Sequence, residues 1–282
     1  RGLKGAARLS QWLVPFMAML WVLTCLLITL WHIVELPSII NLIIRSAFGW
    51  QEAAAGAAGY TVSQAITSGF QRSMFSNEAG MGSTPNAAAA AASFPPHPAA
   101  QGIVQMIGVL IDTIVICSAS AMVVLLAGHG TKTTSYGGIQ LIQHAMSVLV
   151  GDWGASFVAV VIMLFAFTSI VANYIYAENN LIFLRWDKPW AIWLLRIATL
   201  SMVVLGSLLK LPVVWQMADV IMALMAITNL TAILLLSPVV RIIALDYLRQ
   251  RKLGVTPVFD PDYYPEIAQQ LAPDSWDHPP RQ

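Results

Sequence analysis

Long uncharged stretches recur along the chain, and they constrain its fold more than any other feature. The runs Trp12–Leu30, Trp153–Ala177 and Val220–Val240 contain no charged residue, and Gln101–Gly130 and Trp190–Leu209 contain one each. At about 1.5 Å per residue, a helix of this length crosses a hydrocarbon core of about 30 Å. The sequence therefore predicts an all-α integral membrane protein.

The charge balance excludes several other classes of protein. Only 10% of the residues are charged and 57% are hydrophobic, with a net charge of +1. Such a chain has no basic excess for a nucleic-acid backbone and too little charge for intrinsic disorder. The sequence also contains no nucleophile elbow, phosphate-binding loop or zinc motif, so neither an enzyme nor an ATP-driven pump is expected.

The uncharged runs and one polar-interrupted segment predict six membrane crossings. Their approximate ranges are 12–34, 60–92, 101–127, 153–181, 190–209 and 212–237. Basic residues near one face are Arg1, Lys4, Arg8, Arg185, Lys188, Arg241, Arg249, Arg251 and Lys252, and those opposite are Arg45, Lys132 and Lys210. By the positive-inside rule, both ends are expected in the cytoplasm. Residues 251–282 are expected to form a polar, poorly ordered tail.

Two connections on the outer side are expected to be helical. Leu36–Phe48 begins with Pro37 and has an apolar face, which is typical of an interfacial helix. Tyr136–Val150 predicts a second helix lying over the mouth of the bundle.

One expected crossing is interrupted in its middle. Gly69–Asn86 lies between two helix-forming segments, Gly59–Phe75 and the alanine run Ala87–Ala92. Neither segment has room for a complete span plus a loop. We therefore expect one crossing made of two half-helices, joined by unwound backbone near Ser76–Gly82.

The residues of the interruption support this interpretation. Gly80 and Gly82 allow backbone conformations closed to other residues, and Ser83 or Thr84 before Pro85 is a helix-start signal. Free N–H groups at a half-helix start attract carboxylates, and free C=O groups bind cations or amines. A zwitterionic amino acid needs both kinds of group.

An ordinary polar loop is the alternative to the broken helix. It would place Arg72 and Glu78 in water and add a crossing, and an odd number of crossings removes the charge asymmetry between the faces. Arg72 and Glu78 stand six residues apart, so an intact helix would not place them side by side. Across an unwound segment they are expected to form a structural ion pair.

Three polar residues in later spans are candidates for holding a cation. The hydroxyls of Thr168 and Ser169 suit a hard cation, although such hydroxyls also bond back to their own helix. Asp112 lies in the third span, where an acid either neutralises a cation or ties helices together through hydrogen bonds.

Several motifs resemble those of the alanine or glycine:cation symporter family, the sodium:alanine symporters. They are Gly69-Phe70-Gln71-Arg72, Phe75-Ser76-Asn77-Glu78-Ala79-Gly80-Met81-Gly82-Ser83, Val14-Pro15-Phe16-Met17-Ala18, Gln101-Gly102, Asp112-Thr113, Phe165-Ala166-Phe167-Thr168-Ser169 and Tyr176-Ala177-Glu178. Family members resemble the leucine-transporter fold, which contains two inverted repeats of five helices. By that likeness the chain is expected to be the second half of such a bundle, with the N-terminal half missing.

The resemblance also implies roles for individual residues. Phe75 would pack on the substrate's small side chain, while Ser76, Asn77, Glu78 and Gly80 would bring backbone and polar groups to its charged ends. Asn173 stands where many family members have a large aromatic residue, so it is expected to affect the substrate pocket. Thr168 and Ser169 would hold the coupling cation, and Asp112 joins them as a candidate through its charge within an apolar span.

The expected function is sodium-coupled symport of alanine or glycine across a bacterial cytoplasmic membrane. Sodium is the expected coupling ion, with no organic cofactor, and the lipid bilayer is the expected surrounding. Proton-coupled transport, a channel and a non-catalytic membrane subunit are the alternatives.

Overall fold

The computed structural model describes residues 2–48, 58–128, 136–271 and 276, and these contain helices, turns and short connections but no β-strand. Within these described ranges, five helices are long and apolar enough to cross a membrane, at Trp12–Trp31, Pro98–Gly128, Trp153–Phe183, Pro189–Leu208 and Leu211–Lys252. They fall on five of the six expected ranges. Arg1, Lys132 and the tail beyond residue 271, apart from Trp276, lie outside the described residues.

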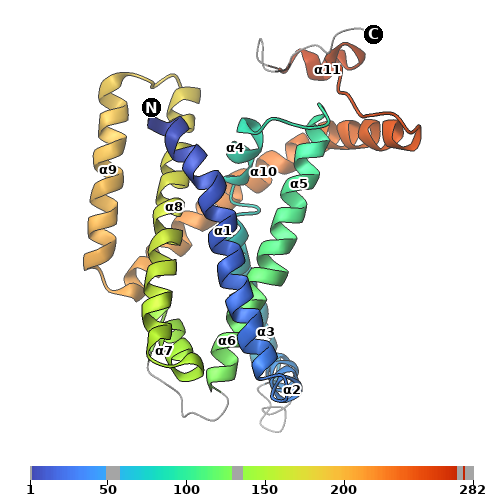
Figure 1. Cartoon of the computed structure of the whole chain (residues 1–282). Helices are drawn as coiled ribbons and strands as arrows, with labels where there is room; N and C mark the ends of the chain where they lie inside the picture. Colours follow the sequence, from blue (N-terminus) through green and yellow to red (C-terminus); the bar gives the residue numbers. More distant parts are fainter. Residues whose placement is uncertain (1, 49–57, 129–135, 272–275, 277–282) are drawn as a thin grey trace. The chain divides into compact units, whose positions relative to one another are not determined.

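The helices follow one another along the chain in the order labelled in Figure 1. Their bounds are α1 Gly2–Trp31, α2 Leu36–Ala47, α3 Ala58–Asn77, α4 Thr84–Ala90, α5 Pro98–Leu110, the π-helix η2 Ile111–Cys117, α6 Ser118–Gly128, α7 Ile139–Val150, α8 Trp153–Phe183, α9 Pro189–Leu208, α10 Leu211–Lys252, the 3₁₀-helix η3 Pro261–Tyr263 and α11 Pro265–Ala268. Helices α2 and α7 stand where the two short connecting helices are expected.

The chain divides into two compact units. The first comprises Arg1–Asn77 and Ile111–Asp219, and the second comprises Glu78–Leu110 and Val220–Gln282. The backbone therefore passes from one unit to the other at three places: after Asn77, before Ile111 and after Asp219.

In the first unit, α1 lies against α6 and α8, and α7 packs on the ends of both (Figure 1). Trp21, Cys25 and Ile28 are spaced four and three residues apart, so α1 presents one apolar face to this core. The Trp21 ring stacks on Phe157, with centroids 6.4 Å apart. Its indole N–H donates to Ser120 Oγ at 2.9 Å. The polar end of a buried tryptophan is thus satisfied within the core.

Gly154 allows α8 to approach α7 closely, which leads to a first prediction. A Cβ on Gly154 would stand 2.7 Å from the Met146 carbonyl oxygen and 2.8 Å from Val150 Cγ2. We expect Gly154→Ala to lower the stability of the protein by about 1–3 kcal/mol, because the backbone oxygen cannot yield. Thermal unfolding in detergent measures the effect. Gly206→Ala on α9 is the matched control, since nothing lies within 4 Å of a Cβ there. Equal unfolding temperatures for both variants would contradict the prediction.

Helix α10 extends further than the expected span 212–237. It has 42 residues with Pro238 in its interior, and its length is about 63 Å at 1.5 Å per residue. A proline lacks the N–H that would bond the carbonyl four residues earlier, here that of Leu234. The Ser237 hydroxyl donates to the Leu234 oxygen at 2.8 Å instead. The carbonyl is thereby satisfied, and the helix continues to Lys252.

The second unit contains α4, α5, most of α10 and the segment that follows it. The expectation of a poorly ordered tail is wrong for the described residues from 255 to 271. Phe259 is 1% exposed and Ile267 is 6% exposed, so this segment has apolar side chains buried in the unit. The average composition of the segment is polar, so it does not indicate that these few apolar side chains are buried. Burial of one aromatic residue is enough to hold the neighbouring chain in place.

Candidate functional site

The interruption between α3 and α4 contains several of the predicted site residues. Helix α3 ends at Asn77, α4 begins at Thr84, and turns connect them. Glu78, Gly80 and Gly82 have φ angles of 55°, 94° and 92°. The left-handed position that ends α3 is therefore filled by Glu78, a residue type that rarely adopts it. Strained backbone of this kind tends to occur at functional sites.

The π-helix η2 in the first unit carries further candidate residues. Asp112, Thr113 and Cys117 lie on η2, where the wider winding interrupts the run of α-helix from α5 to α6. π-helical turns are rare and occur frequently at functional sites. No residue pattern in this apolar stretch predicts the change of winding.

Hydrogen bonds join the end of α3 to η2 within the first unit. The Ser76 hydroxyl donates to Asp112 Oδ2 at 2.7 Å, and the Cys117 sulfur lies 3.1 Å from the same hydroxyl oxygen. Since the Ser76 proton is given to Asp112, the Cys117 thiol acts as the donor in the second contact. Asn77 Nδ2 donates to Thr113 Oγ1 at 2.9 Å. Two consecutive residues of α3 are thus held by two consecutive residues of η2.

A cavity of about 420 Å³ in the first unit lies beside this network. Its lining comes from α1, η2, α6, α7 and α8 and is mostly apolar, with Trp21, Ser120, Asp112 and Ser169 as its polar members. Ser120 accepts from Trp21 and donates to the Ile116 carbonyl, so its hydroxyl is already engaged. The cavity therefore offers Asp112 and Ser169 to a ligand, and Asp112 is the charged group among the described lining residues.

The structure separates two of the expected cation ligands. Thr168 is buried, and its hydroxyl donates to the Leu164 and Phe165 carbonyls of its own helix at 3.2 and 2.9 Å. Ser169 lines the cavity, whereas Thr168 is not among the lining residues. Neighbouring residues of a helix point about 100° apart, so the two hydroxyls face different surroundings. Asn173 is exposed and donates to the Ser169 carbonyl at 2.9 Å.

The start of α10 holds the aromatic and basic residues of α3. The Phe75 ring meets Trp215 edge-on, with centroids 5.1 Å apart. The Arg72 guanidinium lies 4.3 Å from the centre of the same ring. Trp215 and Asp219 stand four residues apart and so share a face of α10, which is the sequence signal that would have identified them.

Arg72 pairs with Asp219, at 3.4 Å between Nη1 and Oδ1, where the sequence led us to expect Glu78. The expected pair required an unwound segment between the two residues. Helix α3 remains helical through Asn77, and Glu78 belongs to the second unit. The Arg72 and Asp219 side chains are 49% and 32% exposed, so the pair lies at the surface of the first unit.

The predicted site residues are therefore placed in three groups. Ser76, Asn77 and Asp112 meet directly, and Ser169 shares a cavity with Asp112. Phe75 packs on Trp215 nearby in the same unit. Glu78 and Gly80 belong to the second unit.

Comparison with known proteins gives a consistent result. A model of the sodium:alanine symporter family matches residues 1–261. The transporter YaaJ of Escherichia coli, described as uncharacterized, is 72% identical over 98% of this chain and 58% of its own length. The amino-acid carrier protein AlsT of Bacillus subtilis is 43% identical over 92% of this chain and 53% of its own. The sodium/proton-dependent alanine carrier protein of a Bacillus species is 31% identical over 93% of this chain and 61% of its own length.

Two facts about coverage follow from these matches. The chain spans a little more than half the length of the curated relatives that it matches. The family match itself runs over residues 1–261, which conflicts with the expectation that the N-terminal half is missing, and that expectation is not retained.

Proposed function

The chain belongs to the sodium:alanine symporter family, and from this premise we propose that it acts as a secondary active transporter of a small neutral amino acid. Alanine or glycine would enter the cell together with sodium. The protein would be a multi-pass component of a bacterial cytoplasmic membrane with both chain ends in the cytoplasm. Its bundle would follow the inverted-repeat arrangement of the leucine-transporter fold.

The observation that carries this proposal is the bond from Ser76 to Asp112 beside a ligand-sized cavity. A carboxylate at membrane depth costs about 2.5–3.5 kcal/mol on insertion scales, so it faces a partner, water or a functional site. Asp112 has one oxygen bonded to Ser76 and also lines the cavity. The volume of this cavity, about 420 Å³, lies in the usual range for small-molecule sites.

Within the first unit, Asp112 and Ser169 are the stronger candidates for the coupling ion. Sodium is a hard cation, and these residues present oxygen atoms to one cavity. Thr168 is the weaker candidate, because it is buried outside the lining of this cavity. Phe75, Ser76, Asn77 and Asn173 are proposed to contact the amino acid.

Within the second unit, Glu78 and Gly80 stay predicted as substrate-binding residues through their unwound backbone. The positive φ angles of both turn their peptide groups out of the helical pattern. The Glu78 carbonyl there accepts from the Met81 N–H at 3.3 Å and from Thr84 Oγ1 at 3.4 Å, so a substrate would have to share or replace these bonds.

The backbone passes between the two units at three places, and these places support the proposal of alternating access. Asn77, Asp112 and Asp219 stand at or next to the places where the backbone passes between the two units. These residues also carry the hydrogen bonds and the ion pair of the site. A movement of one unit would therefore reach the site through the backbone itself.

Uptake by proteoliposomes tests the coupling ion. We expect labelled alanine to accumulate under an inward sodium gradient and to stop accumulating when choline replaces sodium. A proton gradient imposed without sodium is the comparison, because a single carboxylate such as Asp112 also suits a proton. Accumulation that follows the proton gradient and ignores sodium would replace the first proposal by proton-coupled transport. Glutamine and glycine as competitors define the range of substrates.

A further inference from the structure

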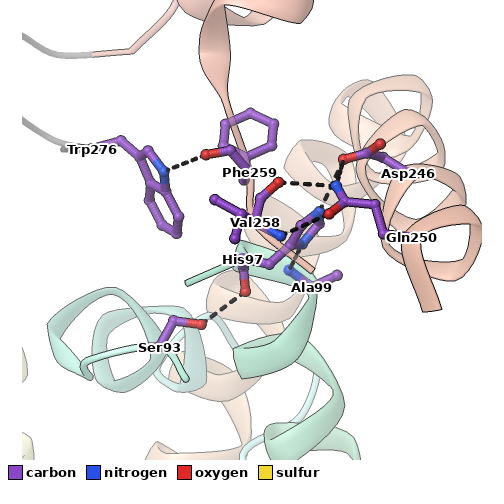
Figure 2. Close-up of polar contacts among 8 residues, drawn as sticks. All are labelled: Ser93, His97, Ala99, Asp246, Gln250, Val258, Phe259 and Trp276. Atoms are coloured by element: carbon purple, nitrogen blue, oxygen red, sulfur yellow. Dashed lines mark hydrogen bonds and ion pairs between the residues drawn. The ribbon is translucent and has the colours of Figure 1, made fainter. Parts of the chain in front are cut away.

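Hydrogen bonds join α10 both to the segment that follows it and to the connection between α4 and α5 (Figure 2). Gln250 on α10 pairs with the backbone of Val258 in both directions, through Nε2 to the carbonyl at 2.9 Å and from the N–H to Oε1 at 2.8 Å. The Phe259 N–H donates to the Pro96 carbonyl at 2.9 Å. The Gln250 amide thus forms the same pair of bonds with Val258 that a neighbouring β-strand would form. Together with the Phe259 bond, these contacts connect α10, the tail and residues 93–97.

Phe259 supplies the apolar centre of this arrangement. It is 1% exposed, and its ring meets His97 edge-on with centroids 5.7 Å apart. The Tyr264 ring stacks on Phe259, with centroids 5.9 Å apart. The Trp276 indole N–H donates to the Phe259 carbonyl at 3.0 Å, as Figure 2 shows. The tail is therefore held by burial as well as by hydrogen bonds.

His97 is completely buried, and both of its ring nitrogens have a partner. The Ala99 N–H donates to Nδ1 at 3.2 Å, and Nε2 stands 3.2 Å from Asp246 Oδ2. Since Nδ1 accepts, the proton of a neutral ring is on Nε2 and is given to Asp246. A second proton would have to enter Nδ1, where it would face the Ala99 N–H. The geometry therefore selects the neutral ring.

The groups around His97 oppose a second proton only in part. From α10, Asp246 accepts from His97, Tyr247 packs on its ring with centroids 5.2 Å apart, and Arg249 lies on the following turn. From the tail, Tyr264 also bonds to Asp246, and burial raises its pKa, so it stays neutral in mild acid. Burial lowers the pKa of His97 below its ordinary 6.5, while the hydrogen bond and charge of Asp246 raise it.

These contacts define a clasp made of His97, Asp246, Gln250, Val258 and Phe259. We propose that this clasp holds the tail on the α4–α5 connection at neutral pH and opens in acid. The opened form gains a proton on the released imidazole, whereas the closed form must lose the Ala99 bond to accept one. The closed form is therefore favoured fully above pH 6.5 and loses its advantage as the pH falls below that value.

The clasp would govern a segment that adjoins the interruption. Residues 93–97 connect α5 to α4, and α4 begins directly after the turns at 78–83. Ser93 keeps this connection compact by donating to the His97 and Pro95 carbonyls, at 2.8 and 3.0 Å. Opening of the clasp removes the bond from Phe259 to Pro96 and the bond from His97 to Asp246, which fix the connection to the tail and to α10.

Hydrogen exchange of the backbone amides of Val258 and Phe259 tests this proposal without a transport assay. The protein is placed in lipid nanodiscs at pH 7.5 and pH 5.5, and rates are corrected for the intrinsic pH dependence of exchange. We expect the corrected rate to rise by up to about tenfold in acid, which is the effect of one released imidazole that titrates near 6.5. A corrected rate that is equal at the two pH values would overturn the proposal.

Three variants separate the titration from the rest of the clasp. His97→Gln keeps an amide donor for Asp246 but does not titrate, so its corrected exchange rate should be the same at both pH values. Gln250→Ala removes both bonds to Val258 and should speed exchange at both. Gln269→Ala, an exposed residue after α11, is the control and should match the parent protein. Acid-dependent exchange that persists in His97→Gln, or full protection in Gln250→Ala, would contradict the mechanism.

Discussion

Replacing Asp112 by asparagine is expected to reduce sodium-driven alanine uptake by about 10- to 100-fold, because a charge-assisted interaction is worth about 1.5–3 kcal/mol. The substitution keeps the size of the side chain and an oxygen that can accept from Ser76. What it removes is the negative charge that Asp112 presents to the cavity. The loss should therefore fall on cation binding, with little change in folding.

The measurement for Asp112→Asn is initial uptake against sodium concentration in proteoliposomes. A cation role predicts that the half-saturating sodium concentration rises before the maximal rate falls. Asp187→Asn, an exposed acid in the connection between α8 and α9, is the matched control and should behave as the parent protein. If Asp112→Asn unfolds at a much lower temperature but keeps its sodium dependence, Asp112 is a structural tie between η2 and α3.

Replacing Gly82 by valine is expected to cost about 2 kcal/mol or more in stability and to abolish uptake, since both the backbone and the space oppose it. The φ angle of +92° lies in the region that side chains with a Cβ rarely adopt. A Cβ there would also stand 3.2 Å from the side chain of Asn229 in the same unit. The strain would fall on the interrupted segment, whose backbone conformation the proposed transport requires.

Gly108→Val on α5 is the comparison for Gly82→Val. Nothing lies within 4 Å of a Cβ on Gly108, which is helical. Thermal unfolding and alanine uptake should therefore change much less in this variant. Equal unfolding temperatures and equal uptake in the two valine variants would show that the left-handed backbone at Gly82 has no special role.

The parts of the fold that could be predicted from sequence depend on local chemistry. The uncharged runs predict spans because the cost of placing a charge in lipid acts on each residue separately. Gly80, Gly82 and Pro85 predict an interruption because their backbone preferences are intrinsic. The structure has α3 ending at Asn77 and α4 beginning at Thr84, on either side of these glycines.

The parts that could not be predicted depend on partners distant in the chain. The apolar residues of η2 do not predict its π-helical winding. Its hydrogen bonds to Ser76 and Asn77 also could not be predicted, because those residues lie on α3. Arg72 meets Asp219, 147 residues later in the chain.

The length of α10 has a consequence for the way the clasp would sense its surroundings. A hydrocarbon core about 30 Å thick accommodates only about half of this helix, so we expect its C-terminal turns to stand in the water of one compartment. Asp246 and Gln250 lie on those turns. The clasp would thus exchange protons with a single reservoir. The clasp would respond to the pH of that compartment alone. A change of pH on the other side of the membrane would leave it closed or open as before.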